Sequence, residues 1–386
     1  MFENLMDQEF PFRKKGSNYL NTSGLSIPPM SVLRFLHETY IRIAINPELE
    51  FDYDDQLNQI TDHFRNIMNQ KSESFSFLRN VTEGLMIAAQ SVTFNNKDEI
   101  IVTSLEHRVA LNCWKIRQQQ EPKLELKIVE VKITPDYTSL DIILAIKSAI
   151  NKKTKVICIP HIDRYYGIVF PVERICSLAN ENNIYSIVDG AQTLGLIDVD
   201  FDYINCDIYL SCLHKWYLAP MTLGTISVNS RVFNQLLRSY ASSSRWGDLQ
   251  FSKREFGGRE LGTRNVALEH SIGELITFHN RFDDYINTPT NIKEYFVNEL
   301  AKIPGVIIIP TWQMIRNYGI VTFYFEDFDT KKIINLLKER YQIIVGISSR
   351  EIDMLRVSLF FYNTYLQVDE LLNGLQHIIS ADNRKK

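Results

Sequence analysis

Short apolar segments alternate with amphipathic segments between about residue 75 and residue 230, and this pattern constrains the fold most strongly. The apolar segments are rich in β-branched residues and predict strands at 99–104, 127–133, 155–160, 185–189, 207–210 and 224–228. Apolar positions spaced three and four apart predict helices at 139–151 and 171–182. Strands that alternate with helices favour an α/β fold with a mainly parallel central sheet between helices, and such sheets bind ligands at the carboxyl ends of their strands.

The pattern changes over residues 305–380, where strands are predicted at 306–309, 321–325 and 355–360 and helices at 330–340 and 368–379. These elements predict a smaller α+β domain, and a helical segment over 265–285 connects it to the rest. We therefore expect an N-terminal arm (1–45) that contributes to the small domain, a large ligand-binding domain (46–285) and a small C-terminal domain (286–386).

Charge and cysteine content exclude several classes of partner. The 386 residues include 42 Lys+Arg and 46 Asp+Glu, so no basic excess exists to neutralise the phosphates of a nucleic acid or an anionic membrane. No apolar run approaches the ~18 residues of a membrane span, and the N-terminus lacks the apolar core of a signal peptide. Five scattered cysteines without a CxxC pair predict reduced thiols and a cytoplasmic protein.

Several common enzyme signatures are missing from the sequence. It contains no GxGxxG after a strand, no GxxxxGK[ST], no HExxH and no GxSxG, which disfavours dinucleotide dehydrogenases, P-loop enzymes, zincins and α/β-hydrolases. The eight histidines lack metal-ligand spacing, so we expect no metal site.

Residues 185–224 carry the strongest chemical signal. Asp189 ends a predicted strand and is followed by Gly190 and Ala191, small residues that would let a flat ligand approach. Lys215 follows another predicted strand beside Trp216, and an apolar setting lowers the pKa of a lysine and makes its amine nucleophilic. A carboxylate at a neighbouring strand end can hold a protonated ring nitrogen. Together these residues suit pyridoxal 5'-phosphate, PLP.

Motifs along nearly the whole chain resemble one family in order and spacing: Tyr19-Leu20-Asn21, Arg79-Asn80-Val81-Thr82-Glu83-Gly84, Glu106-His107, His161 with Gly167 and Pro171, Val188-Asp189-Gly190-Ala191-Gln192, His214-Lys215-Trp216, Gly262-Thr263-Arg264-Asn265, and Arg356-Val357-Ser358 with Tyr362-Asn363. The chain resembles the class V aminotransferase family of fold-type I PLP enzymes. That family includes cysteine desulfurases, isopenicillin N epimerase-like proteins and cysteine C–S lyases.

The resemblance implies roles for residues around the cofactor ring. Lys215 would form the aldimine with PLP and then move the Cα proton as a general acid and base. Asp189 would keep the pyridine nitrogen protonated, and Gln192 would bind the phenolic oxygen. His107 and Arg108 would lie at the ring, with Arg108 standing where desulfurases have a stacking histidine.

The resemblance also implies how the phosphate and the substrate are bound. Val81 and Thr82 form a turn before a predicted helix at about 83–91, whose free N–H groups suit a phosphate, and Ser211 and His214 would add donors. Thr263 would reach the phosphate of a partner subunit, which implies a homodimer. Asn21 and Arg356 would bind the substrate, with Arg356 clamping the α-carboxylate of an amino acid.

Each of these residues also has a purely structural interpretation. Asp189 could cap a helix, and Lys215 could be a surface lysine. Thr82 could simply start a helix, Arg356 could form an internal ion pair, and Ser211 could bond only to backbone.

Departures from the family pattern shape the predicted reaction. Desulfurases carry a nucleophilic cysteine on a loop before the arginine that matches Arg356, whereas here segment 346–351 is short and no cysteine follows Cys212. A persulfide relay on the enzyme needs a thiolate there. We therefore expect β-elimination of the C–S lyase type, or epimerisation, on an amino acid or amino-acid-derived metabolite, and not a persulfide-forming desulfurase. The alternatives are an aminotransferase and a catalytically silent scaffold.

Four arginines bear on the class of substrate. Arg108, Arg164, Arg245 and Arg350 could line the substrate pocket and so favour an acidic or multiply charged amino acid. The alternative is that they are solvated surface arginines.

Overall fold

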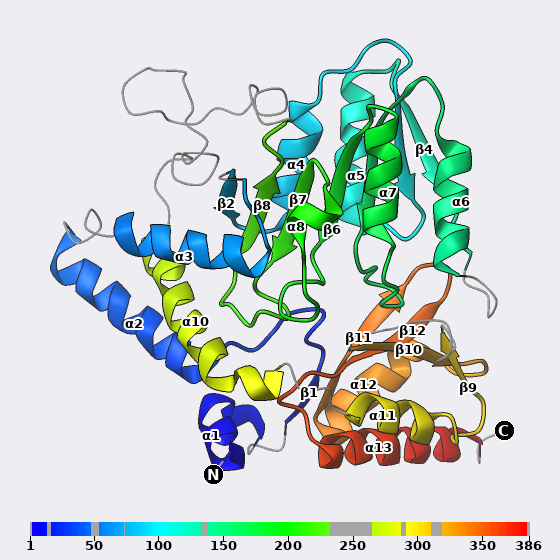
Figure 1. Cartoon of the computed structure of the whole chain (residues 1–386). Coiled ribbons are helices and arrows are strands. Elements are labelled where there is room, and N and C mark those ends of the chain that lie inside the picture. The colour runs from blue at the N-terminus through cyan, green and yellow to red at the C-terminus, as the bar shows by residue number, and fades with distance from the viewer. Residues whose placement is uncertain are drawn as a thin grey trace.

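The structure is a computed structural model that describes residues 2–13, 17–47, 54–72, 74–132, 138–231, 265–286, 291–309 and 319–383. Two sheets, each flanked by helices, form its framework (Figure 1). None of the helices within these ranges is long and apolar enough to cross a membrane.

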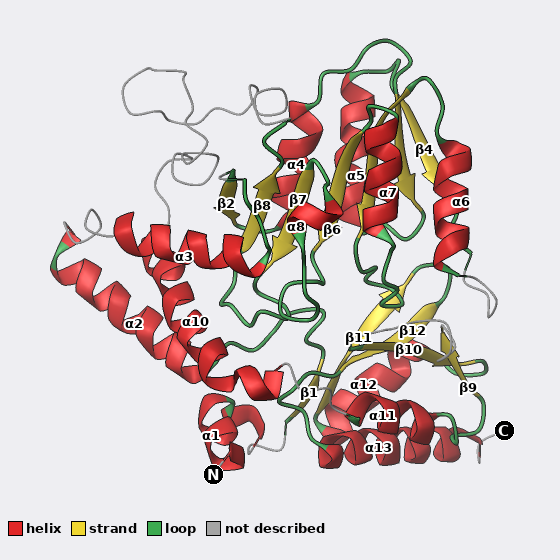
Figure 2. Ribbon diagram, viewed as in Figure 1, coloured by secondary structure: helices red, strands yellow, loops and turns green. Residues whose placement is uncertain are grey.

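The larger sheet has seven strands in the order β2-β8-β7-β6-β5-β3-β4. Five neighbouring strands, β7, β6, β5, β3 and β4, run parallel, and β8 and β2 close one edge with antiparallel pairs (Figure 2). This arrangement confirms the predicted α/β class. The strands are β2 (Phe75–Leu78), β3 (Glu99–Thr103), β4 (Glu125–Val129), β5 (Thr154–Pro160), β6 (Tyr185–Gly190), β7 (Ile208–Cys212) and β8 (Gly224–Val228).

Helices cover both faces of this sheet because alternate strand residues point to opposite sides. In β5, Val156 and Cys158 belong to one apolar cluster, whereas Ile157 and Ile159 belong to the other. The first cluster includes α4 (Val81–Ser91) and α5 (Arg108–Gln120), and the second includes α6 (Ser139–Ala149), α7 (Val172–Glu181) and α8 (Phe201–Ile204).

The smaller sheet has five strands in the order β1-β11-β12-β10-β9. Strand β1 pairs in parallel with β11, and the other pairs are antiparallel. The strands are β1 (Asn18–Leu20), β9 (Val306–Ile309), β10 (Ile320–Phe325), β11 (Ile343–Ser349) and β12 (Asp353–Ser358). A third apolar cluster joins this sheet to α11 (Ile292–Leu300), α12 (Thr330–Tyr341) and α13 (Tyr365–Asn383).

The N-terminal segment contacts both halves of the molecule. It comprises α1 (Phe2–Glu9), the 3-10 helix η1 (Pro11–Arg13), β1, α2 (Met30–Ile45) and α3 (Asp54–Ile67). Whereas β1 joins the small sheet, α2 and α3 pack against α10 (Val266–Ile286), which runs alongside α2 (Figure 1).

Two strands differ from the sequence-based expectation for clear physical reasons. Strand β4 covers 125–129 instead of 127–133, and its exposed edge position leaves little apolar signal at its start. Segment 346–351, expected to be a short loop, is largely strand β11. Its glycine and serines carry no strand propensity, but pairing with β1 on one side and β12 on the other fixes its extended backbone.

Candidate active site

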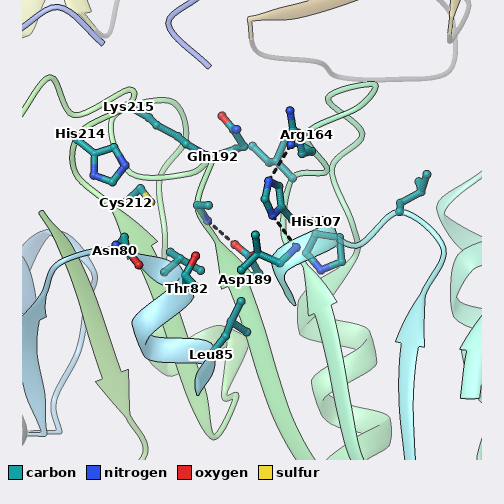
Figure 3. A pocket seen from close by; sticks show the side chains of 16 residues that line it. Asn80, Thr82, Leu85, His107, Arg164, Asp189, Gln192, Cys212, His214 and Lys215 are labelled. Atoms are coloured by element: carbon teal, nitrogen blue, oxygen red, sulfur yellow. Dashed lines mark hydrogen bonds between the residues drawn. The ribbon is translucent and has the colours of Figure 1, made fainter. Parts of the chain in front are cut away.

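A pocket opens at the carboxyl ends of β5, β6 and β7, beside the N-termini of α4 and α5 (Figure 3). Seven of the residues predicted to form the cofactor site line it: Val81, Thr82, His107, Asp189, Gln192, His214 and Lys215. The other lining residues are Asn80, Leu85, Leu105, Val109, Pro160, Ile162, Arg164, Ala191 and Cys212. The parallel sheet therefore brings the predicted residues together at the edge where ligands bind.

Asp189 lies near the end of β6, and only 6% of its surface is exposed. Its Oδ1 accepts a hydrogen bond from the backbone N–H of Ala191 at 2.9 Å, which fixes the carboxyl against the pocket. Burial raises the pKa of Asp189, and the nearby Lys215 opposes this shift. A buried carboxyl of this kind suits a ligand that presents a protonated ring nitrogen.

Lys215 reaches the pocket from the turn after β7. Burial lowers the pKa of its ammonium group, while Asp189 and Cys212 partly offset the shift. The next residue anchors this turn, because Trp216 Nε1 donates to Gln192 Oε1 at 2.7 Å. Gln192 Nε2 donates to the Ser23 carbonyl at 3.0 Å, and its second amide hydrogen is available to a ligand oxygen.

Gly190 has a different role from the one expected. A Cβ atom on Gly190 would lie 2.7 Å from the Leu210 carbonyl oxygen and 2.5 Å from the ring of Tyr209. The glycine is thus required for close packing of β6 on β7, and it is not among the residues that line the pocket. Ala191 is the small residue that lines the pocket.

The N-terminus of α4 offers an anion site. Asn80 caps the helix by accepting the N–H of Glu83 at 3.0 Å, and Val81 and Thr82 occupy its first turn beside the pocket. The first N–H groups of a helix lack partners within it and favour negative charge. His214 donates its Nδ1 hydrogen to the Leu223 carbonyl at 2.8 Å, so its other nitrogen donates to an anion only when the ring is protonated.

Ser211 and Cys212 occupy opposite faces of β7. Ser211 is fully buried, does not line the pocket, and its Oγ lacks a hydrogen-bond partner in the described structure. Cys212 lies on the α4 side and lines the pocket. Side chains of neighbouring strand residues point to opposite faces, so Cys212 lines the pocket and Ser211, one residue earlier, does not.

These donors fit PLP. The buried carboxyl of Asp189 suits the pyridine nitrogen, the amide of Gln192 suits a ring oxygen, and the start of α4 suits the phosphate. Lys215 supplies the amine that would hold the cofactor covalently.

His107 caps α5 and borders the pocket. Its Nδ1 accepts the N–H of Val109 at 3.1 Å, and Nη1 of Arg164 lies 2.7 Å from its Nε2. Burial, followed by the charge of Arg164, lowers the pKa of His107 to about 4, so the ring is neutral at pH 7. Arg108 is not among the lining residues, and its guanidinium donates to the Ser349 carbonyl at 3.3 Å.

Arg356 lies on β12, on the sheet face opposite the helices, with 3% of its surface exposed. It donates from Nη1 to the Arg164 carbonyl at 3.1 Å and from Nη2 to Asn21 Oδ1 at 3.3 Å. Its buried Nε has no partner, and Arg356 forms no ion pair with any residue that the structure describes. Burial lowers the pKa of Arg356 to about 10, with a further contribution from Arg164. A buried guanidinium with free donors is suited to an anionic ligand.

Two predicted positions, Thr263 and Arg245, lie outside the described residues. Sequence reasoning missed Asn80 and Cys212, although Asn80 stands within the quoted motif and an Asn before a helix is a recognised cap signal.

Glu106 is a buried acid behind the pocket that no motif role explains. It is 3% exposed, and neither carboxyl oxygen has a hydrogen-bond partner in the described structure. Burial raises the pKa of Glu106 well above 4.5, and the charges of Asp189 and Asp163 raise it further. The folded protein therefore keeps this proton after the unfolded chain has lost it.

Glu106→Gln is expected to stabilise the fold at neutral pH. Below about pH 4.5 both states of the wild type are protonated, so the variant gains nothing there. Above that pH the gain grows by about 1.4 kcal/mol per pH unit until the folded state ionises. Urea unfolding at pH 4 and pH 7 measures this difference. Equal effects at both pH values would contradict a buried, protonated Glu106.

Comparisons with known proteins agree on one family. The family model described as "Aminotransferase class-V" matches residues 18–371. A probable cysteine desulfurase of Borreliella burgdorferi is 26% identical over 350 residues, covering 82% of this chain and 79% of the relative. An isopenicillin N epimerase of Amycolatopsis lactamdurans is 23% identical over 333 residues, covering 81% of this chain and 82% of the relative.

Solved structures share the fold. The cystine C-S lyase C-DES in complex with its reaction product cysteine persulfide superposes with a TM-score of 0.82 at 19% identity, covering 93% of this chain and 97% of that one. The cysteine desulfurase CsdA of Escherichia coli superposes with a TM-score of 0.80 at 18% identity, covering 98% of both chains. These neighbours confirm the expected fold type.

The expectation that excluded a persulfide-forming desulfurase is wrong. Cysteine desulfurases are prominent among both the relatives and the solved neighbours, and one neighbour was captured with cysteine persulfide as its product. The exclusion assumed that a persulfide must form on a cysteine of the enzyme. In the C-DES complex the persulfide is instead the product itself.

Proposed function

Because this chain belongs to the class V aminotransferase family of PLP-dependent enzymes, we propose that it cleaves the carbon–sulfur bond of a cysteine-type amino acid and releases persulfide sulfur. The observation that carries the proposal is Arg356, a buried guanidinium without an acidic partner in the described structure, which donates to the backbone carbonyl of Arg164, a residue that lines the pocket of Lys215. The desulfurase and C-S lyase relatives support the choice of a sulfur-containing substrate.

Four residues of this chain have separate roles in the proposed reaction. When bound, PLP supplies a sink for negative charge at the substrate Cα. Lys215, with its lowered pKa, takes the Cα proton, and Asp189 holds the proton on the ring nitrogen. Arg356 and Asn21 orient the α-carboxylate, which aligns the Cα–H bond with the base.

Bond breaking at sulfur then needs no enzyme thiol. With the disulfide of two cysteines as substrate, the Cβ–S bond breaks and its electron pair leaves on sulfur as cysteine persulfide. Water releases the remaining three-carbon fragment as pyruvate and ammonia. This balance agrees with a chain in which all five cysteines are buried and none follows Cys212.

The test is to incubate the PLP-loaded protein with L-cystine and, separately, with L-cysteine. We expect persulfide and pyruvate in equal amounts from L-cystine, measured by cyanolysis and by a coupled reductase. Protein stripped of cofactor serves as the control. If no sulfur is released from either substrate while the Cα hydrogen exchanges with solvent deuterium, the proposal fails and an epimerase is favoured.

We further propose that the enzyme is a cytoplasmic homodimer in which Thr263 approaches the partner's cofactor. Free, buried cysteines are typical of a reducing compartment. Apolar side chains on α2 are exposed in the single chain, Tyr40 at 46%, Ile41 at 47% and Ile45 at 79%, as expected of a surface that a second copy covers. Sedimentation at micromolar concentration measures the assembly.

A further inference from the structure

We propose that the substrate carries a second carboxylate at the end of its side chain and that Arg164 binds it. The inference deepens the proposed function, on which it depends for the sulfur-containing class of substrate. The disulfide of two cysteines has such a carboxylate.

Arg164 stands in the loop after β5 and lines the pocket together with His107 and Lys215 (Figure 3). Its guanidinium lies 2.7 Å from His107 Nε2, and its Cζ lies 5.5 Å from the centre of the Tyr165 ring. His107 is neutral at pH 7, since burial and Arg164 itself lower its pKa to about 4, and the contact with Tyr165 is with the face of its ring. Within the described ranges, Arg164 forms no ion pair.

None of the acids close to Arg164 in sequence or space forms an ion pair with it, because each is held elsewhere. Asp163 Oδ1 accepts the N–H groups of Tyr165 and Tyr166 at 2.8 and 2.9 Å, and its Oδ2 accepts that of Ile168 at 2.6 Å. Glu106 is buried and is not among the residues that line the pocket. Asp189 lies at the end of β6, where its Oδ1 accepts the N–H of Ala191, and we assign it to the ring nitrogen of the cofactor. The pocket therefore holds a cation that no carboxylate of the described chain neutralises.

Arg164 and Arg356 are arranged to bind two carboxylates instead of one. Arg356 Nη1 donates to the backbone carbonyl of Arg164, so the two residues are fixed side by side. Their guanidinium groups nevertheless have different neighbours, Asn21 for Arg356 and His107 for Arg164. Two guanidinium groups directed to different points suit a ligand with an anion at each end.

The test compares suberate, which has as many atoms between its carboxylates as cystine, with the monocarboxylate octanoate. Calorimetry on the PLP-loaded protein measures both affinities in the wild type, Arg164→Gln and Arg164→Lys. We expect Arg164→Gln to weaken suberate about 10- to 100-fold while octanoate changes little. Arg164→Lys keeps the charge but lacks the planar guanidinium, so its affinity for suberate is expected to lie between those of the wild type and Arg164→Gln.

Arg350→Gln is the matched control, because Arg350 is paired with Glu130 at 2.7 Å and is not a lining residue. It removes the same charge and is expected to leave the preference for suberate unchanged. The proposal is overturned if Arg164→Gln weakens both ligands equally, since Arg164 would then share the α-carboxylate. It is also overturned if the wild type does not prefer suberate, or if Arg350→Gln has the same effect.

The two proposals fail in distinguishable ways. If the affinity for suberate depends on Arg164 but no sulfur-containing amino acid is cleaved, the proposed reaction is wrong and the second carboxylate site stands. If L-cystine and S-propylcysteine are cleaved equally well and suberate shows no dependence on Arg164, the reaction stands and the second site does not.

Discussion

Lys215→Ala is expected to abolish covalent cofactor attachment and to lower turnover by roughly 10⁴-fold or more, because one amine serves as anchor and as base. The wild type loaded with PLP should show a visible absorption band that borohydride bleaches. Peptide mass mapping should then place the reduced cofactor on Lys215. In the variant the band should be lost after gel filtration.

Lys155→Ala provides the control for this result. Lys155 lies on β5, with its Nζ 5.0 Å from the centre of the Tyr185 ring, and it is not among the residues that line the pocket. Its removal deletes a lysine from another strand of the same sheet and should leave the absorption band intact. A band that survives in Lys215→Ala, or a reduced cofactor mapped to another lysine, would refute the central assignment.

Asp189→Asn is expected to lower kcat by roughly 10²–10³-fold while the protein still binds PLP. An amide of the same shape cannot hold the ring nitrogen protonated, so the ring accepts less negative charge from the substrate. Absorption spectra and steady-state kinetics on the same preparation separate loss of cofactor from loss of turnover. Unchanged kcat in a PLP-loaded variant would show that Asp189 does not contact the ring nitrogen.

Thermal unfolding without cofactor distinguishes this effect from misfolding. Burial raises the pKa of Asp189, so its ionised form destabilises the empty fold, and Asn should leave the melting temperature equal or higher. Asp163→Asn gives the contrast, because Asp163 accepts three backbone N–H groups that an amide cannot match. That variant should melt at a lower temperature.

Local pattern was sufficient to predict most of the framework. Strand β8 and strand β9 have the predicted bounds, and α4 begins within two residues of the expected start. Period-two and helical spacing are properties of neighbouring residues, so they can be read without knowing the fold. The parallel order then placed Asp189 and Lys215 at one edge, because parallel strands end on the same side of a sheet.

Side-chain direction was harder to predict. Ser211 was expected to contact the ligand, but Cys212 lines the pocket, because side chains alternate along a strand and β7 ends two residues beyond the predicted 207–210. Gly190 was assigned to ligand approach, whereas contact with Tyr209 on the next strand explains it. The first difference arises from alternation along β7, and the second from close packing of β6 on its neighbour β7.

The sequence by itself therefore determined the α/β class, the cofactor motif and the residues at the strand ends, since each depends on local periodicity and short-range motifs. Only the tertiary structure decided which groups meet across the two sheets. Within the small sheet Arg356 contacts Asn21, which is 335 residues away, and across the two sheets it contacts the Arg164 carbonyl, which is 192 residues away. Such contacts depend on how two separately formed sheets dock, and the free energy of that docking is spread over the whole interface and not encoded in any one segment.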